Sequence, residues 1–216
     1  AYAIENGPSG FDEAAPQHFP KIKFLMLMRN AALTKRDARF DDQTKTLTLL
    51  EAGAVLASER LDMAEGRAVL ETFFEKRFEK EKRGKLKILH APDFSFSDSN
   101  SKVLHLVNLD TIDVLEDIVG GSVHPLRFRA NLYISGAPAW SEFEWVGRNI
   151  RVGDVEFKAA NRTARCAATA VNPSTNERDI DIPQLLRKHC GHADCGIYLK
   201  VVTNGSVKAG DKLYVE

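Results

Sequence analysis

The hydrophobic positions of the chain change their period several times, and each period predicts a different element. Tyr2 and Ile4 alternate with small or polar neighbours, as residues of a strand do. The segments 21–29 and 45–60 are rich in β-prone residues, and 51–53 forms a turn signal inside the second of them. The first part of the chain is therefore predicted to consist of short strands and loops.

A strand at the second residue also bears on where the chain starts. The sequence has no initiating Met, and its first residues, AYAIEN, already follow a strand pattern. We therefore expect that a segment before Ala1 has been removed or is missing from this sequence.

From Asp62 onward the period becomes helical. Glu65 stands at capping-box distance from Asp62, and Gly84 is expected to end the helix after a run of mixed charge. That charge run is typical of a solvated face and carries no functional signal. The apolar positions that follow helical spacing are Leu70, Phe73, Phe74 and Phe78.

The rest of the chain alternates between strands, helices and turns. Strands are predicted at 86–90 and 103–109, and the serine-rich stretch 91–101 between them is a domain boundary or a flexible lid. A helix is expected to begin at Asp110 as its cap and to end at Gly120, and another runs from about Pro183 to His189.

Two later segments repeat a Gly-Asp turn between β-prone residues, IRVGDVEF at 150–157 and VKAGDKLYV at 207–215. The sequence TNGS at 203–206 adds a hairpin signal. Several short strands separated by turns predict a mainly β fold, a closed β-barrel with a few peripheral helices, and an α+β class for the whole chain.

Composition narrows the possible partners and compartment. The 30 Lys and Arg residues balance the 30 Asp and Glu residues, so no net field favours nucleic acid or a membrane surface. The longest apolar run, 24–28, is far shorter than a membrane span, and no signal peptide is visible. Three cysteines, an odd number, favour a reduced, cytoplasmic protein.

The most conspicuous chemical cluster is RKHCGHADCG, which holds His189, Cys190, His192 and Cys195. A zinc-stabilised binding module would use all four as ligands. However, adjacent side chains diverge, and Cys195 leads directly into an apolar strand, where a cysteine behaves as a small hydrophobe. We therefore favour a helix end, a glycine turn and a buried strand thiol over a metal site.

A second candidate is Cys166 in NRTARCAATAV, which follows Arg162 and Arg165 and precedes Thr169. Guanidinium groups near a thiol favour the thiolate, the form that attacks sulfur or binds a soft metal. The spacing fits a core cysteine on a barrel strand at least as well. Strict alternation would place Arg165 and Cys166 on opposite faces, so joint action requires a bend.

A third candidate is HPLRFRANLYISG at 124–136. Arg127 and Arg129 flank Phe128, and Asn131 opens the following strand. Guanidinium groups suit phosphate oxygens, and an asparagine can donate to and accept from a ring edge. Ion pairing on the surface explains the arginines equally well, so these residues do not decide the question alone.

Taken together, these motifs resemble the MOSC-domain family, named after the C-terminal domain of molybdenum cofactor sulfurase. The family's components occur in order: LVNLDTIDVLE, PLRFRANLYISG, WSEFEWVGRNIRVGDVEF, RCAATAVNPSTNERD and GIYLKVVTNGSVKAGDKLYV. We therefore expect a MOSC domain over 96–216. Residues 1–95 resemble, more loosely, the N-terminal MOSC-associated β-barrel domain, truncated at its start.

The resemblance implies a set of site residues and a cofactor, the molybdenum cofactor (molybdopterin). Cys166 would be the functional thiol and molybdenum ligand. Thr111 stands where the family more often has a serine. The residues implied to bind the pterin and its phosphate, or to line the pocket, are Arg129, Asn131, Arg165, Asn108 and Thr111.

Two functions follow from this resemblance. The first is an oxidoreductase that reduces small N-hydroxylated substrates at molybdenum and requires a separate electron-transfer partner. The second is a sulfur carrier that forms a persulfide on Cys166 with sulfur from a cysteine desulfurase. The zinc-stabilised binding module without chemistry remains a third reading.

Overall fold

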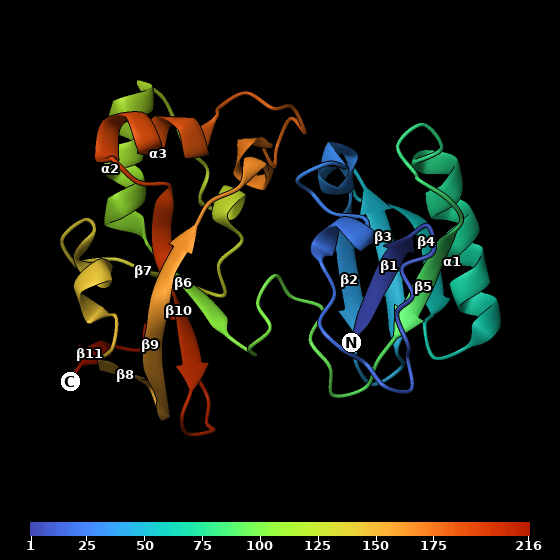
Figure 1. Ribbon diagram of the computed structural model, residues 1–216, viewed down its shortest axis with the longest axis horizontal. Coiled ribbons are helices and arrows are strands. Elements are labelled where there is room, and N and C mark those ends of the chain that lie inside the picture. The colour runs from blue at the N-terminus through green and yellow to red at the C-terminus, as the bar shows by residue number, and fades with distance from the viewer. The chain divides into compact units, whose positions relative to one another are not determined.

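The computed structural model describes all 216 residues, and the chain divides into two compact units (Figure 1). Residues 1–100, together with 174–176, form unit 1, and the remaining residues, 101–173 and 177–216, form unit 2. Each unit has its own buried apolar clusters. The assignment of 1–95 to an N-terminal MOSC-associated barrel stays a prediction.

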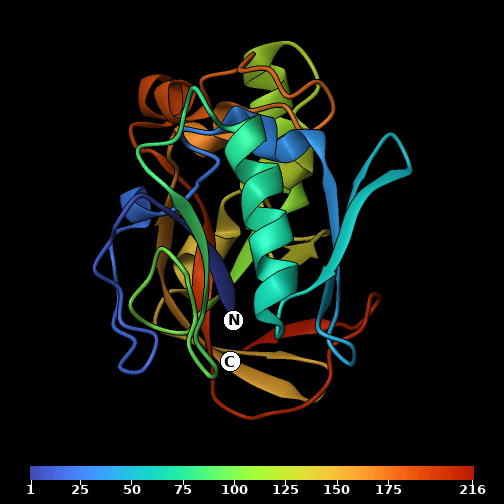
Figure 2. The same ribbon diagram turned by 90° about the vertical axis from the view of Figure 1, so that its right-hand side faces the viewer.

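Unit 1 consists of two small antiparallel sheets and one long helix. One sheet pairs β1 (Tyr2–Asn6) with β5 (Leu86–His90), which confirms the strand predicted at Tyr2. The other has the order β2 (Asp37–Asp41), β3 (Thr46–Glu51) and β4 (Ala54–Arg60). Helix α1 (Ala64–Arg77) packs against β4 and β5 (Figure 2). The hairpin predicted within 45–60 is thus confirmed as β3 and β4.

Three predictions for unit 1 are wrong: the strand within 21–29, the capping box at Asp62 and the helix end at Gly84, since α1 already ends at Arg77. The segment 21–29 forms the 3-10 turn η1 (Lys21–Lys23) followed by irregular chain, and η2 (Ala31–Lys35) comes next. The expected capping box of α1 is also absent, since Met63 occupies the cap position without a side-chain bond. Asp62 instead accepts from Arg60, with an Nε–Oδ1 distance of 3.0 Å.

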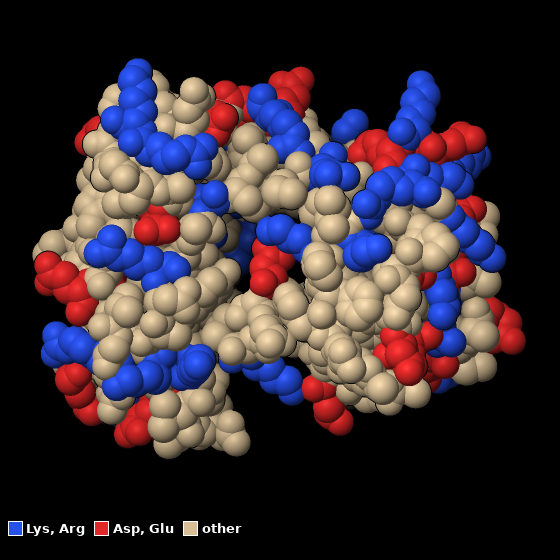
Figure 3. Space-filling model, in the orientation of Figure 1, with Lys and Arg blue, Asp and Glu red and all other residues tan.

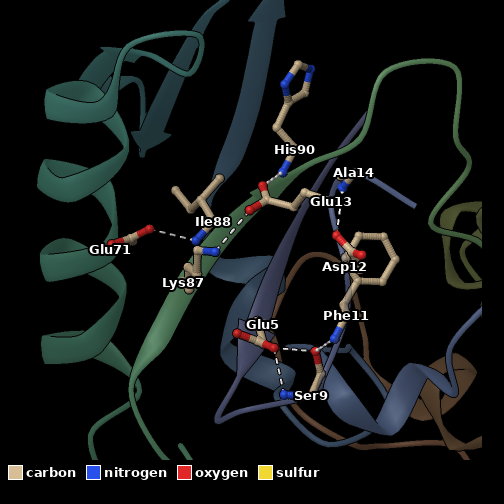
Figure 4. Close-up of polar contacts among 10 residues, drawn as sticks. All are labelled: Glu5, Ser9, Phe11, Asp12, Glu13, Ala14, Glu71, Lys87, Ile88 and His90. Carbon is tan, nitrogen blue, oxygen red and sulfur yellow. Dashed lines mark hydrogen bonds and ion pairs between the residues drawn. The ribbon is translucent and has the colours of Figure 1, made fainter. Parts of the chain in front are cut away.

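Strand β5 pairs with β1 along one edge, and carboxylates cover its other edge (Figure 4). The backbone N–H of Ile88 donates to Glu71 of α1 at 2.7 Å, and that of His90 donates to Glu13 at 2.7 Å. An open strand edge invites pairing with another chain. These side chains satisfy the donors within unit 1.

Unit 2 is built around one six-stranded sheet in the order β11-β8-β9-β10-β6-β7. Only β6 and β7 run parallel, and the other neighbours are antiparallel. The sheet curls into a half-barrel in which β11 and β7 are the two outer strands, so the closed barrel predicted from the sequence does not form. The α+β class is confirmed. The strands are β6 (Leu104–Asn108), β7 (Leu132–Ile134), β8 (Asn149–Val152), β9 (Val155–Ala164), β10 (Asp194–Val201) and β11 (Leu213–Val215).

Two helices accompany this sheet, α2 (Leu109–Val119) and α3 (Ile182–Cys190). Asn108, rather than Asp110, caps α2, because its Oδ1 accepts from the N–H of Asp110 at 3.2 Å. Helix α2 ends as predicted at Gly120, which adopts φ 70°. The short 3-10 segments are η3 (Pro125–Phe128), η4 (Ser141–Trp145) and η5 (Ala167–Ala170). No helix of the structure has the length and the apolar composition that crossing a membrane would require.

The C-terminal strand does not form the hairpin that TNGS suggested. Strand β10 ends at Val201, and β11 pairs with β8, not with β10. On the face drawn in Figure 3, basic and acidic side chains are interspersed, as the zero formal net charge leads one to expect.

The central sheet of unit 2 is buried on both faces. On β6, Leu106 belongs to one apolar cluster and its neighbour Val107 to another, as alternation requires. On β10, however, Cys195 and Ile197 would share a face of a regular strand, yet they belong to different clusters. A β-bulge between Asp194 and Ile197 causes this switch.

Gly196 lies in that bulge, and no other residue fits there. Its φ of 80° is in the left-handed region, and a Cβ would lie 2.3 Å from the carbonyl oxygen of Leu106 and 2.8 Å from Nε2 of His105. The backbone of β10 therefore approaches β6 closely enough to exclude any side chain.

We predict that Gly196→Ala destabilises unit 2 much more than Gly136→Ala does. Gly136 has φ 81°, so alanine there meets the same backbone strain, but a Cβ would have no neighbour within 4 Å. The control substitution, Gly136→Ala, should lower the free energy of unfolding by about 1 kcal/mol. Gly196→Ala should lower it by about 3 kcal/mol or more, because β6 must move.

The measurement is urea unfolding followed by tryptophan fluorescence. The only two tryptophans, Trp140 and Trp145, both belong to unit 2, so the signal reports that unit. Equal losses of stability in the two variants would show that the close approach at Gly196 is unimportant.

Candidate functional site

Cys166 lies where β9 has just ended and the turn η5 is about to begin. It is half-buried, and its carbonyl oxygen accepts from the backbone N–H of Thr169 at 3.1 Å and from Oγ1 of the same residue at 2.9 Å. The strand stops at Ala164, but Cys166 itself keeps an extended backbone, with φ −117° and ψ 175°, and η5 begins only after it. Joint action of Arg165 and Cys166 stays a prediction.

Arg127 holds the turn that follows Cys166. Its side chain is almost completely buried, and its guanidinium donates to the carbonyl oxygen of Ala170 at 3.1 Å and to Asp179 at 2.8 Å. Burial alone would raise the pKa of Asp179, but hydrogen bonds from Asn172 and Arg127 outweigh it and lower this pKa. Arg127 thus forms an ion pair, but as a buried residue and not on the surface as the alternative assumed.

Arg165 points its guanidinium into unit 2. Nε donates to the carbonyl oxygen of Cys195 at 2.9 Å and one terminal nitrogen donates to that of Phe128 at 3.4 Å. The other terminal nitrogen contacts the imidazole of His105. Burial lowers the pKa of Arg165. An arginine nevertheless stays charged in a protein, and none of these acceptors is a carboxylate.

The second arginine predicted to act on Cys166 is engaged elsewhere. The guanidinium carbon of Arg162 lies 4.3 Å from the centre of the Phe143 ring, a cation–π contact. Of the two arginines, Arg165 is thus the one that stays a candidate for acting on Cys166.

Arg129 and Asn131 lie at the end of η3 and the start of β7. Arg129 is exposed and caps η3 in the left-handed conformation, with φ 51°. Oδ1 of Asn131 accepts from the N–H of His105 at 2.9 Å, and the N–H of Asn131 donates to the carbonyl oxygen of His105 at 2.8 Å. Asn131 is therefore fixed against β6.

His105 connects these predicted residues, and the sequence reasoning missed it. Its ring contacts Arg165 and the backbone of Cys195, Phe128 and Arg129. Burial, together with the charge of Arg165, lowers the pKa of His105 to about 3, so the imidazole is neutral at neutral pH. The one available signal was a histidine inside an apolar strand, in VLHLV.

The two remaining predicted residues, Asn108 and Thr111, form hydrogen bonds with Glu142 and not with Arg165 or His105. Asn108 and Thr111 are fully buried, and both donate to the carboxylate of Glu142, Asn108 at 3.5 Å and Thr111 at 3.2 Å. Oγ1 of Thr111 also accepts from the N–H of Trp140 at 2.9 Å. Their polar atoms thus bond within unit 2, and a role in cofactor binding stays a prediction.

Glu142 is a second residue that the sequence reasoning missed. It is fully buried, none of its hydrogen-bond partners is a cation, and burial raises its pKa. It joins the cap of α2 to the turn η4.

The conspicuous histidine and cysteine cluster does not converge. His189 is exposed at the end of α3, and Cys190 packs at the edge of an apolar cluster. The ring of His192 lies edge-on to Phe143, while Cys195 is fully buried and its pKa is raised to about 12 by burial. No group of three or more side chains of the types His, Cys, Asp and Glu is placed to hold a metal ion.

A cavity of about 460 Å³ lies in unit 1. Its walls are apolar, with residues such as Ile4, Leu49 and Phe74, and Arg36 is the one charged side chain among them. None of the predicted site residues lines it.

The chain was compared with known proteins. The sequence model of the MOSC domain family matches residues 93–214. Mitochondrial amidoxime reducing component 2 of Rattus norvegicus is 28% identical over 123 residues, which cover 51% of this chain and 36% of that protein. Mitochondrial amidoxime-reducing component 1 of Homo sapiens is 29% identical over 105 residues, or 43% of this chain and 31% of that protein. The matched region is thus about a third of each relative's length.

Among solved structures, YiiM from Geobacillus stearothermophilus is similar with a TM-score of 0.42 and 16% identity, covering 52% of this chain and 53% of that chain.

We predict that lowering the pH from 7 to 4 stabilises wild type relative to Glu142→Gln. The pKa of Glu142 is raised in the folded state, so the folded state binds its proton more tightly than the unfolded state does. The stability that this group contributes is therefore complete below the ordinary pKa of Glu and is lost as the pH rises through the raised pKa.

The measurement is the difference in free energy of unfolding between the two proteins at several pH values. Glu144→Gln, an exposed position in the same turn, is the matched control. A difference between wild type and Glu142→Gln that stays constant with pH would contradict the prediction.

Proposed function

The chain belongs to the MOSC domain family, and from this we propose that it is a molybdenum-cofactor protein in which Cys166 ligates the metal. We further propose that it is an oxidoreductase that reduces small N-hydroxylated substrates. The similar proteins named amidoxime reducing components support this choice of substrate class. The match spans only about a third of each of those relatives. The proposed activity is therefore argued from the site residues of this chain.

The observation that carries the proposal is the buried guanidinium of Arg165. Its acceptors are the carbonyl oxygens of Cys195 and Phe128 and the neutral ring of His105. A buried charge without a counter-ion is costly, and an anion beside it offsets that cost. The thiolate of Cys166, next in sequence, and the phosphate of the cofactor would supply such negative charge.

The donor set fits the molybdenum cofactor. A thiolate is a soft ligand of the kind that molybdenum accepts. Arg129 is exposed, so its guanidinium can reach phosphate oxygens, which it suits geometrically. Oδ1 of Asn131 is engaged by His105, which leaves the amide NH₂ group of Asn131 as its donor toward the pterin.

The residues of the chain have distinct roles in this proposal. The bound molybdenum centre would supply the transfer of an electron pair. Cys166 would hold the metal, on a turn to which Arg127 is hydrogen-bonded, and Arg165 would offset the negative charge of the ligand. In the reaction the N–O bond of the substrate breaks, two electrons and two protons are taken up, and water is released. A separate electron-transfer partner supplies the electrons.

We expect wild type, made in a host that synthesises the cofactor, to hold on the order of one molybdenum atom per chain, and Cys166→Ala to hold at least tenfold less. Elemental analysis of the purified proteins measures this. Cys190→Ala, which removes another half-buried thiol, should retain the metal. Wild type without molybdenum, or a Cys166→Ala variant with as much as wild type, would refute the proposal.

A sulfur carrier is the alternative, and the position of Cys166 favours it as well. Cys166 is half-buried, follows Arg165 in sequence, and stands at the start of a turn rather than inside a strand. In the transfer, the Cys166 thiolate attacks the outer sulfur of a cysteine desulfurase persulfide. A new S–S bond forms on Cys166, the donor S–S bond breaks, and the desulfurase leaves as a thiolate.

For this alternative, incubation with a cysteine desulfurase and cysteine should add about 32 daltons, one sulfur atom, to the peptide that contains Cys166. Mass spectrometry of the digested, non-reduced protein detects the addition. The peptide with the fully buried Cys195 serves as internal control and should keep its mass. An unmodified Cys166 peptide, after a time in which the desulfurase itself carries sulfur, excludes the carrier function.

A further inference from the structure

His105 occupies a place on β6 where an apolar side chain would be expected. It is 6% exposed and lies between Leu104 and Leu106 in sequence. Neither the family resemblance nor the motifs singled it out. A buried polar ring in such a strand requires hydrogen-bond partners, and His105 has them on several sides.

The ring acts on Arg165. One terminal nitrogen of that guanidinium contacts the imidazole, while Nε donates to the carbonyl oxygen of Cys195. A guanidinium has donors only, so the ring must offer a lone pair and must therefore be neutral. The low pKa of His105, caused by burial and by Arg165, meets this requirement at neutral pH.

The backbone of His105 acts on Asn131. Its N–H donates to Oδ1 of Asn131 at 2.9 Å, and its carbonyl oxygen accepts from the N–H of Asn131 at 2.8 Å. The absent Cβ of Gly196 leaves the space that the ring occupies, since that atom would lie 2.8 Å from Nε2 of His105. One residue thus contacts two side chains that are expected to hold the cofactor.

We propose that His105 is a positioning residue, which fixes the guanidinium of Arg165, the neighbour of Cys166 in sequence, and, through its backbone, the amide of Asn131. An anionic ligand would then meet donors that are already in place, so that binding orders few side chains. The identity of that ligand as the molybdenum cofactor rests on the proposed function, whereas the fixing of Arg165 does not.

The test replaces His105 with Leu, which removes the acceptor, and with Gln, which keeps a neutral acceptor on a side chain of similar length. The readout is the rate at which iodoacetamide alkylates Cys166 at pH 7.5 (about the pH of ordinary buffers), measured by mass spectrometry. We expect a rate at least threefold lower in His105→Leu, because the guanidinium of Arg165 is then no longer held in place next to the residue that reacts. His105→Gln should recover most of the wild-type rate.

Leu199→Ala controls for a general loss of stability. Leu199 is fully buried on β10 and belongs to the cluster on the other side of the bulge, so its truncation destabilises unit 2 without removing a partner of Arg165. Its alkylation rate should equal that of wild type. A similar decrease in Leu199→Ala, or a rate in His105→Leu equal to or above wild type, overturns the positioning role.

Molybdenum content separates this inference from the proposed function. If wild type holds molybdenum, His105→Leu should hold severalfold less, and an equal content counts against the inference. If wild type holds none while the alkylation rates follow the expected order, the molybdenum proposal fails and the positioning role of His105 stands.

Discussion

The arrangement of unit 2 depends on a guanidinium that is buried without an acidic partner. Arg165 takes its acceptors from three separate parts of the chain: β10 through the carbonyl oxygen of Cys195, η3 through that of Phe128, and β6 through the ring of His105. A buried cation that lacks any one of these would be left with an unsatisfied donor, which is costly. The packing of these segments is therefore coupled to the charge at the end of β9.

Glu142 and Arg165 are both buried ionisable residues, and the free-energy cost of burying their charge is reduced in different ways. Glu142 can become neutral, and burial raises its pKa in that direction while Asn108 and Thr111 donate to it. Arg165 cannot release its proton in a protein, so its positive charge persists. The region around Glu142 is thus well suited to fasten α2 to η4, whereas the region around Arg165 retains a charge that an anion can balance. This contrast makes Arg165, rather than Glu142, the better centre for a ligand site.

The spacing of apolar residues correctly predicted those elements whose apolar residues also face a core in the structure. The hairpin β3–β4 and helices α2 and α3 were predicted, because their apolar residues face one core and glycine or proline marks their ends. The segment 21–29 was predicted wrongly as a strand, since an apolar run alone does not distinguish a strand from a loop that contributes to a core. The capping box at Asp62 failed because Arg60 offers that carboxylate a stronger, charge-assisted bond.

The site was only partly predictable for a different reason. Cys166, Arg129 and Asn131 lie in motifs that can be recognised locally, but nothing near them in sequence indicates His105 or the carbonyl oxygen of Cys195. These groups come together because β10 lies between β9 and β6, and because the bulge at Gly196 brings its backbone against His105. Any ligand bound beside Arg165 therefore depends on a strand order and a bulge that no single motif encodes. A substitution that alters the bulge should affect the site even though it replaces none of the predicted site residues.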